Sequence, residues 1–363
     1  MEQRIFNFSA GPAVLPLPVL QRAREELVSY PGAGMSVMEM SHRSKAFAAI
    51  HEAAKANIKA LLGLPDHYRV LFIAGGATMQ FIMLAMNFLG KDKSADYVQC
   101  GSWASKAMSE AKRFGAVRAV WSGKDENYVR MPANEELDLD PNAAYVHFTS
   151  NETIQGIQTR TEPEVGETPL FCDASSDFFS RPIAADKYAL LYAGAQKNAG
   201  PAGMAVVILR EDLLELVPEG LPSLLDYRLM AENDSLYNTP PCYTIYITGL
   251  VARWLKDDVG GLEKMDAVNR AKAQLLYDAI DQSGGFYKGH ARTDSRSLMN
   301  VTFTLPEPDL EARFVTEAKA AGMDGLKGHR SVGGCRASIY NAMPAAGCEA
   351  LRDFMIEFQR KNG

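Results

Sequence analysis

The segment YALLYAGAQKNAGPAG, residues 188–203, joins an apolar run of strand length to a lysine among small residues. Residues 188–193 predict a buried strand. Lys197 follows it, between Gln196 and Asn198 and amid glycines and alanines that leave room for a ligand. Burial lowers the pKa of a lysine, which prepares its amine to act as a Schiff-base nucleophile and proton carrier. A surface lysine in a glycine-rich loop is the alternative interpretation, and the rest of the chain has to decide between the two.

The composition is typical of a globular protein, with 363 residues, 47% hydrophobic and 23% charged. This length suits two domains, or one large α/β unit with an appendage. A net charge of -6 offers no basic surface for nucleic acid or an anionic membrane. The five cysteines form no C-x-x-C pair, and the sequence shows neither a signal peptide nor an apolar run of membrane-spanning length. We therefore expect a cytoplasmic protein with no nucleic-acid or membrane partner.

Strand-like and helix-like segments alternate from residue 68 onward. YRVLFIAG (68–75) and ADYVQCG (95–101) read as strands, and each is followed by a helical segment. Further strand candidates are VRAVWSG, AAYVHFTSNET, PLFCDASS, YALLYAGAQKN and MAVVILR. This alternation predicts an α/β fold whose mainly parallel sheet is covered by helices on both faces. In such sheets ligands bind outside the carboxyl ends of the strands.

Several chemically distinct groups follow the predicted strands. In chain order they are Gly75 to Thr78, Trp103, Thr153, Asp173 and Lys197. Each has a plain structural alternative, such as a tight turn, a core aromatic or a helix cap. Together they provide an anion cradle at a helix start, an aromatic platform, a carboxylate and an amine. That set is complementary to pyridoxal phosphate, whose ring nitrogen would pair with Asp173 and whose aldehyde would react with Lys197.

Other cofactors fit the sequence poorly. No G-x-G-x-x-G follows a strand, which argues against a nicotinamide site, and no Walker A loop occurs. The six histidines form neither an i, i+4 pair nor a Cys-His cluster, so we expect no metal site.

The two ends of the chain predict a smaller α+β domain. Residues 7–18 read as an extended arm before a helix predicted for residues 17–30, and Gly260-Gly261 marks a boundary before further helices and strands. We expect a large cofactor-binding domain at 16–259 and a small domain at 1–15 and 260–363. The small domain carries His329, Arg330 and Arg336 within eight residues, and His42-Arg43 precedes the helix at 45–62. These cations suit recognition of carboxylate or phosphate, although solvated surface positions are the alternative.

Seven segments in order give the whole chain a resemblance to the phosphoserine aminotransferase family, a class-V branch of the fold-type-I pyridoxal-phosphate enzymes. They are FNFSAGPAVLP, SVMEMSHRSKAF, ADYVQCGSWASKA, SNETIQGI, YAGAQKNAGPAG, YNTPP and GHRSVGGCRASIYNAM. A generic aminotransferase would share the aspartate and the lysine, but not the last of these segments.

The resemblance implies that Lys197 is the Schiff-base lysine, that Asp173 pairs with the pyridine nitrogen and that Trp103 stacks on the ring. The further cofactor contacts that it implies are Ala77, Thr78, Thr153, Gln196, Asn238 and Thr239. Substrate binding would fall to His42, Arg43, His329 and Arg330 at the distal phosphate or carboxylate, and to Arg336 at the α-carboxylate. Asn238 and Thr239 would reach the neighbouring subunit's cofactor, which implies a homodimer with shared active sites.

The implied reaction is a reversible ping-pong transfer of the amino group of L-glutamate to 3-phosphohydroxypyruvate, giving 2-oxoglutarate and O-phospho-L-serine for serine biosynthesis. The family also acts on 4-phosphohydroxythreonine in vitamin B6 synthesis, a second substrate that stays open here. Thr78 stands where some members have an arginine, so one cation for the substrate phosphate is lost. The alternatives are a cysteine desulfurase using Cys335, an alanine-glyoxylate aminotransferase, or a binding protein that has lost the chemistry.

Overall fold

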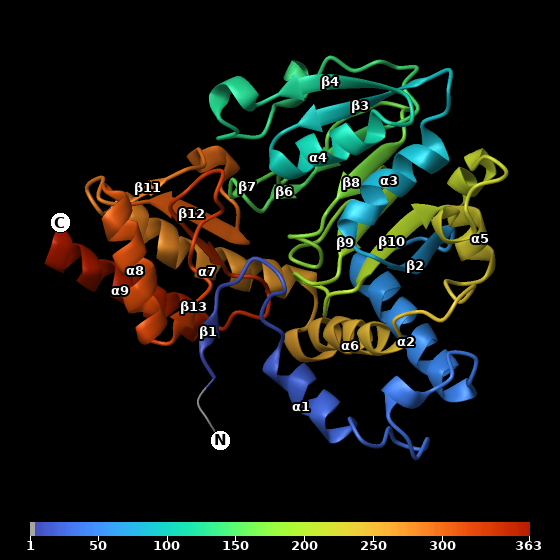
Figure 1. The fold of residues 1–363 in the computed structure, drawn as a ribbon, viewed down its shortest axis with the longest axis horizontal. Coiled ribbons are helices and arrows are strands. Elements are labelled where there is room, and N and C mark those ends of the chain that lie inside the picture. Colours follow the sequence, from blue (N-terminus) through green and yellow to red (C-terminus); the bar gives the residue numbers. More distant parts are fainter. Residues whose placement is uncertain (1–3) are drawn as a thin grey trace.

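The computed structural model describes residues 4–363, and a seven-stranded sheet forms its centre (Figure 1). The strand order is β2-β10-β9-β8-β5-β3-β4. β10 runs antiparallel to both of its neighbours, and all other neighbouring pairs are parallel. The strands are β2 Tyr68–Ala74, β3 Ser94–Gln99, β4 Ala116–Ser122, β5 Val146–Thr149, β8 Leu170–Asp173, β9 Leu190–Gly194 and β10 Met204–Arg210. The predicted α/β fold with a mainly parallel sheet is confirmed.

Helices cover both faces of this sheet. Successive residues of each strand point to opposite sides, so a strand of apolar residues presents side chains to the helices on each face. In β2, Phe72 packs into the core that includes residues of α2 and α6, whereas Ile73 packs into the core that includes residues of α3 and α4. The four helices are α2 Lys45–Leu62, α3 Ala77–Phe88, α4 Ser102–Ala111 and α6 Cys242–Arg253. β9 is buried along its whole length, as expected for a central strand covered on two faces.

Local signals place both ends of α2. Ser44 caps α2 by accepting a hydrogen bond from the backbone N–H of Phe47, and Gly63 ends this helix in the left-handed region at φ +60°. The helix predicted for residues 17–30 is shorter, since α1 ends at Glu25. Beyond it, Glu26 turns inward to accept a hydrogen bond from the buried hydroxyl of Tyr246, 2.7 Å away.

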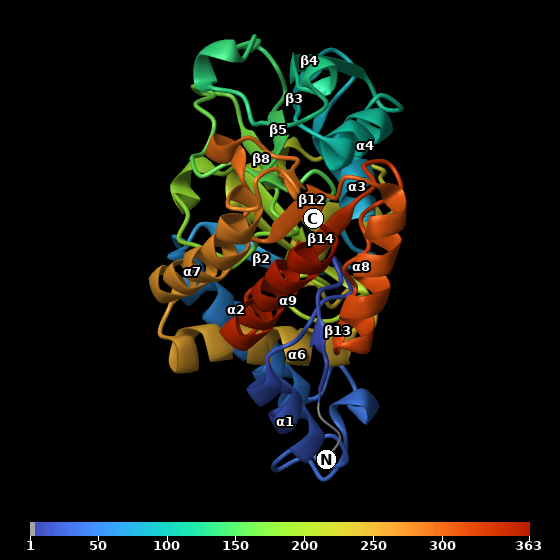
Figure 2. The ribbon, with the colours of Figure 1, turned by 90° about the vertical axis from the view of Figure 1, so that its left-hand side faces the viewer.

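The C-terminal part builds a second hydrophobic core from Phe8 and from side chains between residues 273 and 358. Its helices are α7 Leu262–Asp281, α8 Pro308–Ala320 and α9 Ala345–Asn362, and its sheet joins β11 Lys288–Gly289, β12 Asn300–Thr304 and β14 Cys335–Ser338. Figures 1 and 2 show the three helices gathered around this sheet, beside the large one. The N-terminal β1 Phe6–Asn7 pairs with β13 Met323–Asp324. The strand-rich smaller unit is confirmed, and its boundaries at 15/16 and 259/260 stay a prediction.

A short hairpin connects the two parts of the molecule. It consists of β6 Asn151–Glu152 and β7 Ile157–Gln158. At Gly156 a Cβ atom would lie 2.6 Å from the backbone oxygen of Asn300, so the hairpin and β12 pack backbone against backbone. Within residues 4–363, no helix combines the length and the apolar character needed to cross a membrane.

Candidate active site

An open cavity of about 570 Å³ lies at the carboxyl edge of the large sheet. It is bounded by the residues that follow β2, β3, β8 and β9 and by the start of the antiparallel β10. Its lining residues are Gly75, Gly76, Ala77, Thr78, Trp103, Asp173, Ser175, Gly194, Gln196, Lys197, Gly203 and Met204. A cavity of this size suits a small cofactor, and its place is the one expected for an open α/β sheet.

Lys197 projects into this cavity from the loop after β9. Its Nζ donates a hydrogen bond to Thr153 Oγ1 at 2.5 Å and lies 5.3 Å from the centroid of the Trp103 ring. Burial lowers the pKa of Lys197 to about 8, against the opposing charges of Asp173 and Glu152. The amine is therefore held close to the protonation change that a nucleophile and proton carrier requires at neutral pH.

Asp173 is the last residue of β8 and is only 3% exposed. Its Oδ1 accepts a hydrogen bond from the backbone N–H of Ser175 at 2.9 Å. Burial raises the pKa of Asp173, while the charge of Lys197 lowers it. A buried carboxylate of this kind gains most from a cationic partner, which a protonated ring nitrogen would supply.

The start of α3 forms an anion cradle. Gly75 and Gly76 have φ of +117° and +104°, and no side chain caps the helix. Across from them, a Cβ atom on Gly194 would lie 3.4 Å from the backbone nitrogen of Ala77, so glycine keeps that N–H accessible. Uncapped N–H groups at a helix start bind phosphate well.

These groups fit pyridoxal phosphate. The phosphate would lie at the Ala77 and Thr78 end, and the aldehyde would reach Lys197. The ring would lie against Trp103, whose indole Nε1 is buried without a hydrogen-bond partner in the part of the chain that the structure describes. Ala77, Thr78, Trp103, Asp173, Gln196 and Lys197 thus line one cavity, and Thr153 joins them through Lys197.

Arg336 lies next to this cavity, on β14 of the small sheet. Its Nη1 donates to the backbone oxygen of Thr153 at 3.4 Å, and its buried Nε has no hydrogen-bond partner among residues 4–363. His329 and Arg330 lie on the loop before β14, where His329 hydrogen-bonds Ser331. The pKa of His329 is lowered by burial, and also by the nearby charges of Arg336, Arg330 and Lys106. The loop therefore adds the charge of Arg330 beside Arg336, and an imidazole whose protonated form is disfavoured until an anion binds.

Four of the predicted residues lie elsewhere in the single chain. His42 and Arg43 occupy the loop before α2, and neither lines the Lys197 cavity. Asn238 lines an adjoining cavity, which shares Gly75 with the first. Thr239 is exposed beside it. The roles given to these four residues stay predictions.

The sequence reasoning did not identify Glu152 and Gln155 as site residues. Both lie in the β6–β7 hairpin and accept hydrogen bonds from the first backbone N–H groups of α4. Trp103 lies in this first turn and lines the cavity. Their only sequence signal was their place in the segment SNETIQGI, next to Thr153.

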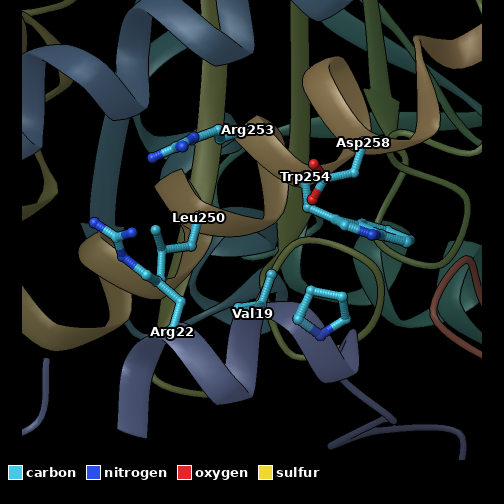
Figure 3. Close-up of a pocket in the computed structure, with 7 residues that line it drawn as sticks. Val19, Arg22, Leu250, Arg253, Trp254 and Asp258 are labelled. Atoms are coloured by element: carbon cyan, nitrogen blue, oxygen red, sulfur yellow. The ribbon is translucent and has the colours of Figure 1, made fainter. Parts of the chain in front are cut away.

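A second cavity, of about 450 Å³, lies between α1 and the end of α6, where residues Trp254–Val259 form a π-helix (Figure 3). Arg22 and Arg253 reach it, but Arg22 pairs with Glu26, and Arg253 lies 3.5 Å from Asp257. Neither cation is left without a partner, and the site residues predicted above do not line this cavity.

A cluster of His51, Glu52 and Asp234 has the donor atoms of a metal site. The Nζ of Lys55 lies 2.7 Å from Glu52 and 2.5 Å from Asp234. An ammonium group thus already satisfies both carboxylates.

Comparison with known proteins identifies the family. The profile of the family described as Aminotransferase class-V matches residues 5–351. The chain is 56% identical to phosphoserine aminotransferase of Desulfosudis oleivorans over 364 residues, and 52% identical to that of Lysinibacillus sphaericus over 362, with 100% of each chain covered.

Two solved structures extend this similarity to three dimensions. Phosphoserine aminotransferase from Bacillus circulans subsp. alkalophilus matches with a TM-score of 0.98 at 53% identity, covering 100% of both chains. The pyridoxal-phosphate-bound enzyme from Trichomonas vaginalis matches with a TM-score of 0.92 at 40% identity, covering 97% of this chain and 100% of that one. The chain therefore belongs to the class-V aminotransferases, within the phosphoserine aminotransferase family, and its cofactor is pyridoxal phosphate.

Proposed function

We propose that this protein transfers the amino group of L-glutamate to 3-phosphohydroxypyruvate, giving 2-oxoglutarate and O-phospho-L-serine. The observation that carries the proposal is the position of Lys197, between Thr153 and Trp103 in a cavity that Asp173 closes on one side and Arg336 borders on another. Family membership and full-length relatives at 52–56% identity support the substrate assignment.

The chain's own groups have distinct roles in this reaction. Bound pyridoxal phosphate supplies an electron-accepting ring that stabilises negative charge at the substrate α-carbon. Asp173 would keep the ring nitrogen protonated, and Trp103 would hold the ring plane. The Lys197 amine would hold the cofactor through its aldehyde group and, once freed, would accept the proton from the substrate α-carbon. Thr153 orients that amine through its 2.5 Å hydrogen bond.

We assign substrate selection to the arginine and histidine side chains. Arg336 would bind the α-carboxylate common to glutamate and phosphoserine, because a guanidinium matches a carboxylate bidentately. His42, Arg43, His329 and Arg330 would bind the distal phosphate or carboxylate. With Thr78 in place of an arginine, the phosphate site has one cation fewer. The same site would accept 4-phosphohydroxythreonine, which also carries a phosphate and an amino acid group.

We propose a homodimer with shared active sites, because four assigned residues lie apart both from the Lys197 cavity and from the groups that adjoin it, namely His42, Arg43, Asn238 and Thr239. Large apolar side chains are exposed within five positions of these residues in the sequence, including Met38 at 60% and Tyr237 at 43%. Such surface is typical of an interface. A monomer in analytical ultracentrifugation at micromolar concentration would contradict this proposal.

Two further assignments complete the proposal. All five cysteines are free, which supports a cytoplasmic location. The chain would divide into a large domain, 16–259, and a small domain, 1–15 with 260–363. The two hydrophobic cores of the sheet and a third around α7 to α9 support this division.

The structure argues against a cysteine desulfurase. Cys335 is 1% exposed on β14, and burial raises its pKa to about 12. A persulfide-forming cysteine needs an accessible thiolate.

The test of the function is the visible spectrum of the cofactor-loaded protein on addition of L-phosphoserine, with L-serine and L-alanine as controls. Conversion to the pyridoxamine form by phosphoserine alone is the expected result. A response only to alanine or to cysteine would show that this protein has the substrate specificity of a different enzyme with the same fold.

Capture of pyridoxal phosphate by the cofactor-free protein is expected to depend on pH. The folded pKa of Lys197 is lowered to about 8, and only the neutral amine attacks the aldehyde. The capture rate should therefore rise about tenfold per pH unit below pH 8 and level off above it. Stopped-flow absorbance from pH 6 to pH 9.5 measures it, with Lys197→Ala as the blank. A plateau only above pH 10 would show that the amine is not desolvated.

A further inference from the structure

The start of α4 is capped by a distant segment. Gly101, which precedes the helix, has no side chain to cap it. The backbone N–H groups of Trp103 and Ala104 instead donate to the two carboxylate oxygens of Glu152, at 3.0 and 2.7 Å. The N–H of Ser102 donates to Gln155 Oε1 at 3.3 Å. Glu152 and Gln155, here called the α4 clamp, thus bind the first three N–H groups of the helix.

Burying the Glu152 carboxylate at this position is energetically costly. It is fully buried, and burial raises its pKa to about 7, against the lowering effect of the two N–H groups. A Cβ atom on Gly101 would lie 2.8 Å from Glu152 Oε1 and closer still to its Cγ and Cδ, so only glycine admits the carboxylate. A buried carboxylate is tolerated where hydrogen bonds compensate its desolvation. The contact is therefore specific to this pair of segments.

The same hairpin also reaches the catalytic amine. Thr153, the residue after Glu152, accepts the hydrogen bond from Lys197 Nζ, and its backbone oxygen accepts one from Arg336. Thr302 Oγ1 of β12 donates to the backbone oxygen of Gln155 at 2.9 Å, which ties the hairpin to the small sheet. In Figure 1 the hairpin lies between α4 and β12. One short segment therefore connects the aromatic platform, the amine and the substrate arginine.

We propose that the α4 clamp is a positioning device, in which Glu152 and Gln155 fix Trp103 against the cofactor ring in register with Thr153 and Lys197. The proposal rests on the stacking role given to Trp103 under the proposed function. If Glu152 and Gln155 served only as a helix cap, they would affect only the stability of the fold. A positioning residue must also change how the cofactor is held, without touching the cofactor itself.

The experiment measures cofactor binding rather than turnover. The chain has three tryptophans, so Trp121→Phe and Trp254→Phe leave Trp103 as the sole tryptophan. The cofactor-free full chain is titrated with pyridoxal phosphate, while quenching of Trp103 fluorescence and the visible circular dichroism of the bound cofactor are recorded. Thermal unfolding of each cofactor-free variant is measured in parallel.

The matched pair is Glu152→Gln and Asp96→Asn. Asp96 is also fully buried, and its Oδ2 accepts a backbone N–H, from Asp140 at 2.7 Å, but it lies near the amino end of β3, away from the cavity. Each substitution replaces a buried carboxylate by an amide of nearly the same size. Both should lower the melting temperature. Only Glu152→Gln should weaken cofactor binding, by roughly tenfold to a hundredfold, and reduce the dichroism of the bound cofactor.

Wild-type affinity, quenching and dichroism in Glu152→Gln would overturn the proposal and leave Glu152 a helix cap. If that variant does not fold, Gln155→Ala tests the same proposal with a smaller change. It removes one side chain of the clamp, so an affinity loss of roughly threefold to tenfold is expected. Unchanged binding there would overturn the proposal. No substrate enters these measurements, so a failure of the phosphoserine assignment would leave their outcome unaffected.

Discussion

Replacing Lys197 by alanine is expected to lower transamination of L-phosphoserine by at least about 10³-fold. The substitution removes both the amine that attaches the cofactor and the base that moves the α-proton. No other lysine lines the cavity, so no neighbour can take over the role. The measurement is the single-turnover rate of formation of the pyridoxamine form.

The fold of this variant should be unchanged. Within residues 4–363 the Lys197 side chain hydrogen-bonds Thr153 alone, and its burial disfavours the charged amine. Removing the amine therefore relieves a desolvation cost, and the melting temperature of the cofactor-free protein should stay the same or rise. Lys187→Ala is the matched control, because Lys187 is exposed ten residues upstream and should keep full activity.

Added small primary amines give a sharper test. The substitution removes the lysine side chain beyond Cβ, and the space that it vacates can take a molecule as small as methylamine. An amine at that point can accept the α-proton, so partial recovery of the rate in Lys197→Ala is expected, with none in wild type. Turnover of Lys197→Ala within tenfold of wild type, without added amine, would remove Lys197 from its assigned role.

The cavity could be predicted from the sequence because its parts are local. The apolar run at 188–193 supplies all of β9 except its last residue, Lys197 follows the strand, and Asp173 ends β8. In a parallel sheet, strand ends meet at one edge, so residues at successive ends converge without any knowledge of long-range contacts. This is why Trp103, Asp173 and Lys197 could be assigned together.

The α4 clamp could not be predicted in the same way. Glu152 and Trp103 are 49 positions apart, and their contact depends on how the β6–β7 hairpin packs against α4. Neither hydrophobic periodicity nor turn chemistry carries that information. The early end of α1 has a similar cause, because the buried hydroxyl of Tyr246 draws Glu26 inward from 220 positions away. Side-chain hydrogen bonds between distant elements are where local patterns lose their predictive value.

Replacing Arg336 by alanine is expected to raise KM for L-glutamate and for L-phosphoserine alike, by roughly 10²- to 10³-fold. Hydrogen bonds between charged partners each contribute about 1.5–3 kcal/mol, and a guanidinium makes two to one carboxylate. Arg336 is suited to this role, since its buried Nε lacks a partner and its Nη1 makes only a long contact, 3.4 Å, to Thr153. Initial rates in both directions measure the effect.

Two variants separate charge from geometry. Arg336→Lys keeps the charge but not the planar pair of donors, so an intermediate loss is expected. Arg292→Ala is the control, because Arg292 is exposed and pairs with Asp294 at the surface. A selective loss for phosphoserine in Arg336→Ala would place this arginine at the phosphate and not at the α-carboxylate.

The double variant His329→Ala and Arg330→Ala should show the opposite selectivity. Removing two groups at the phosphate should reduce kcat/KM for phosphoserine far more than for serine, since serine has no phosphate to bind. Burial, and after it the charges of Arg336 and Arg330, lower the pKa of His329, and a bound dianion would raise it, so the effect should grow below pH 7. Equal losses for the two amino acids would show that the loop shapes the site without binding the phosphate.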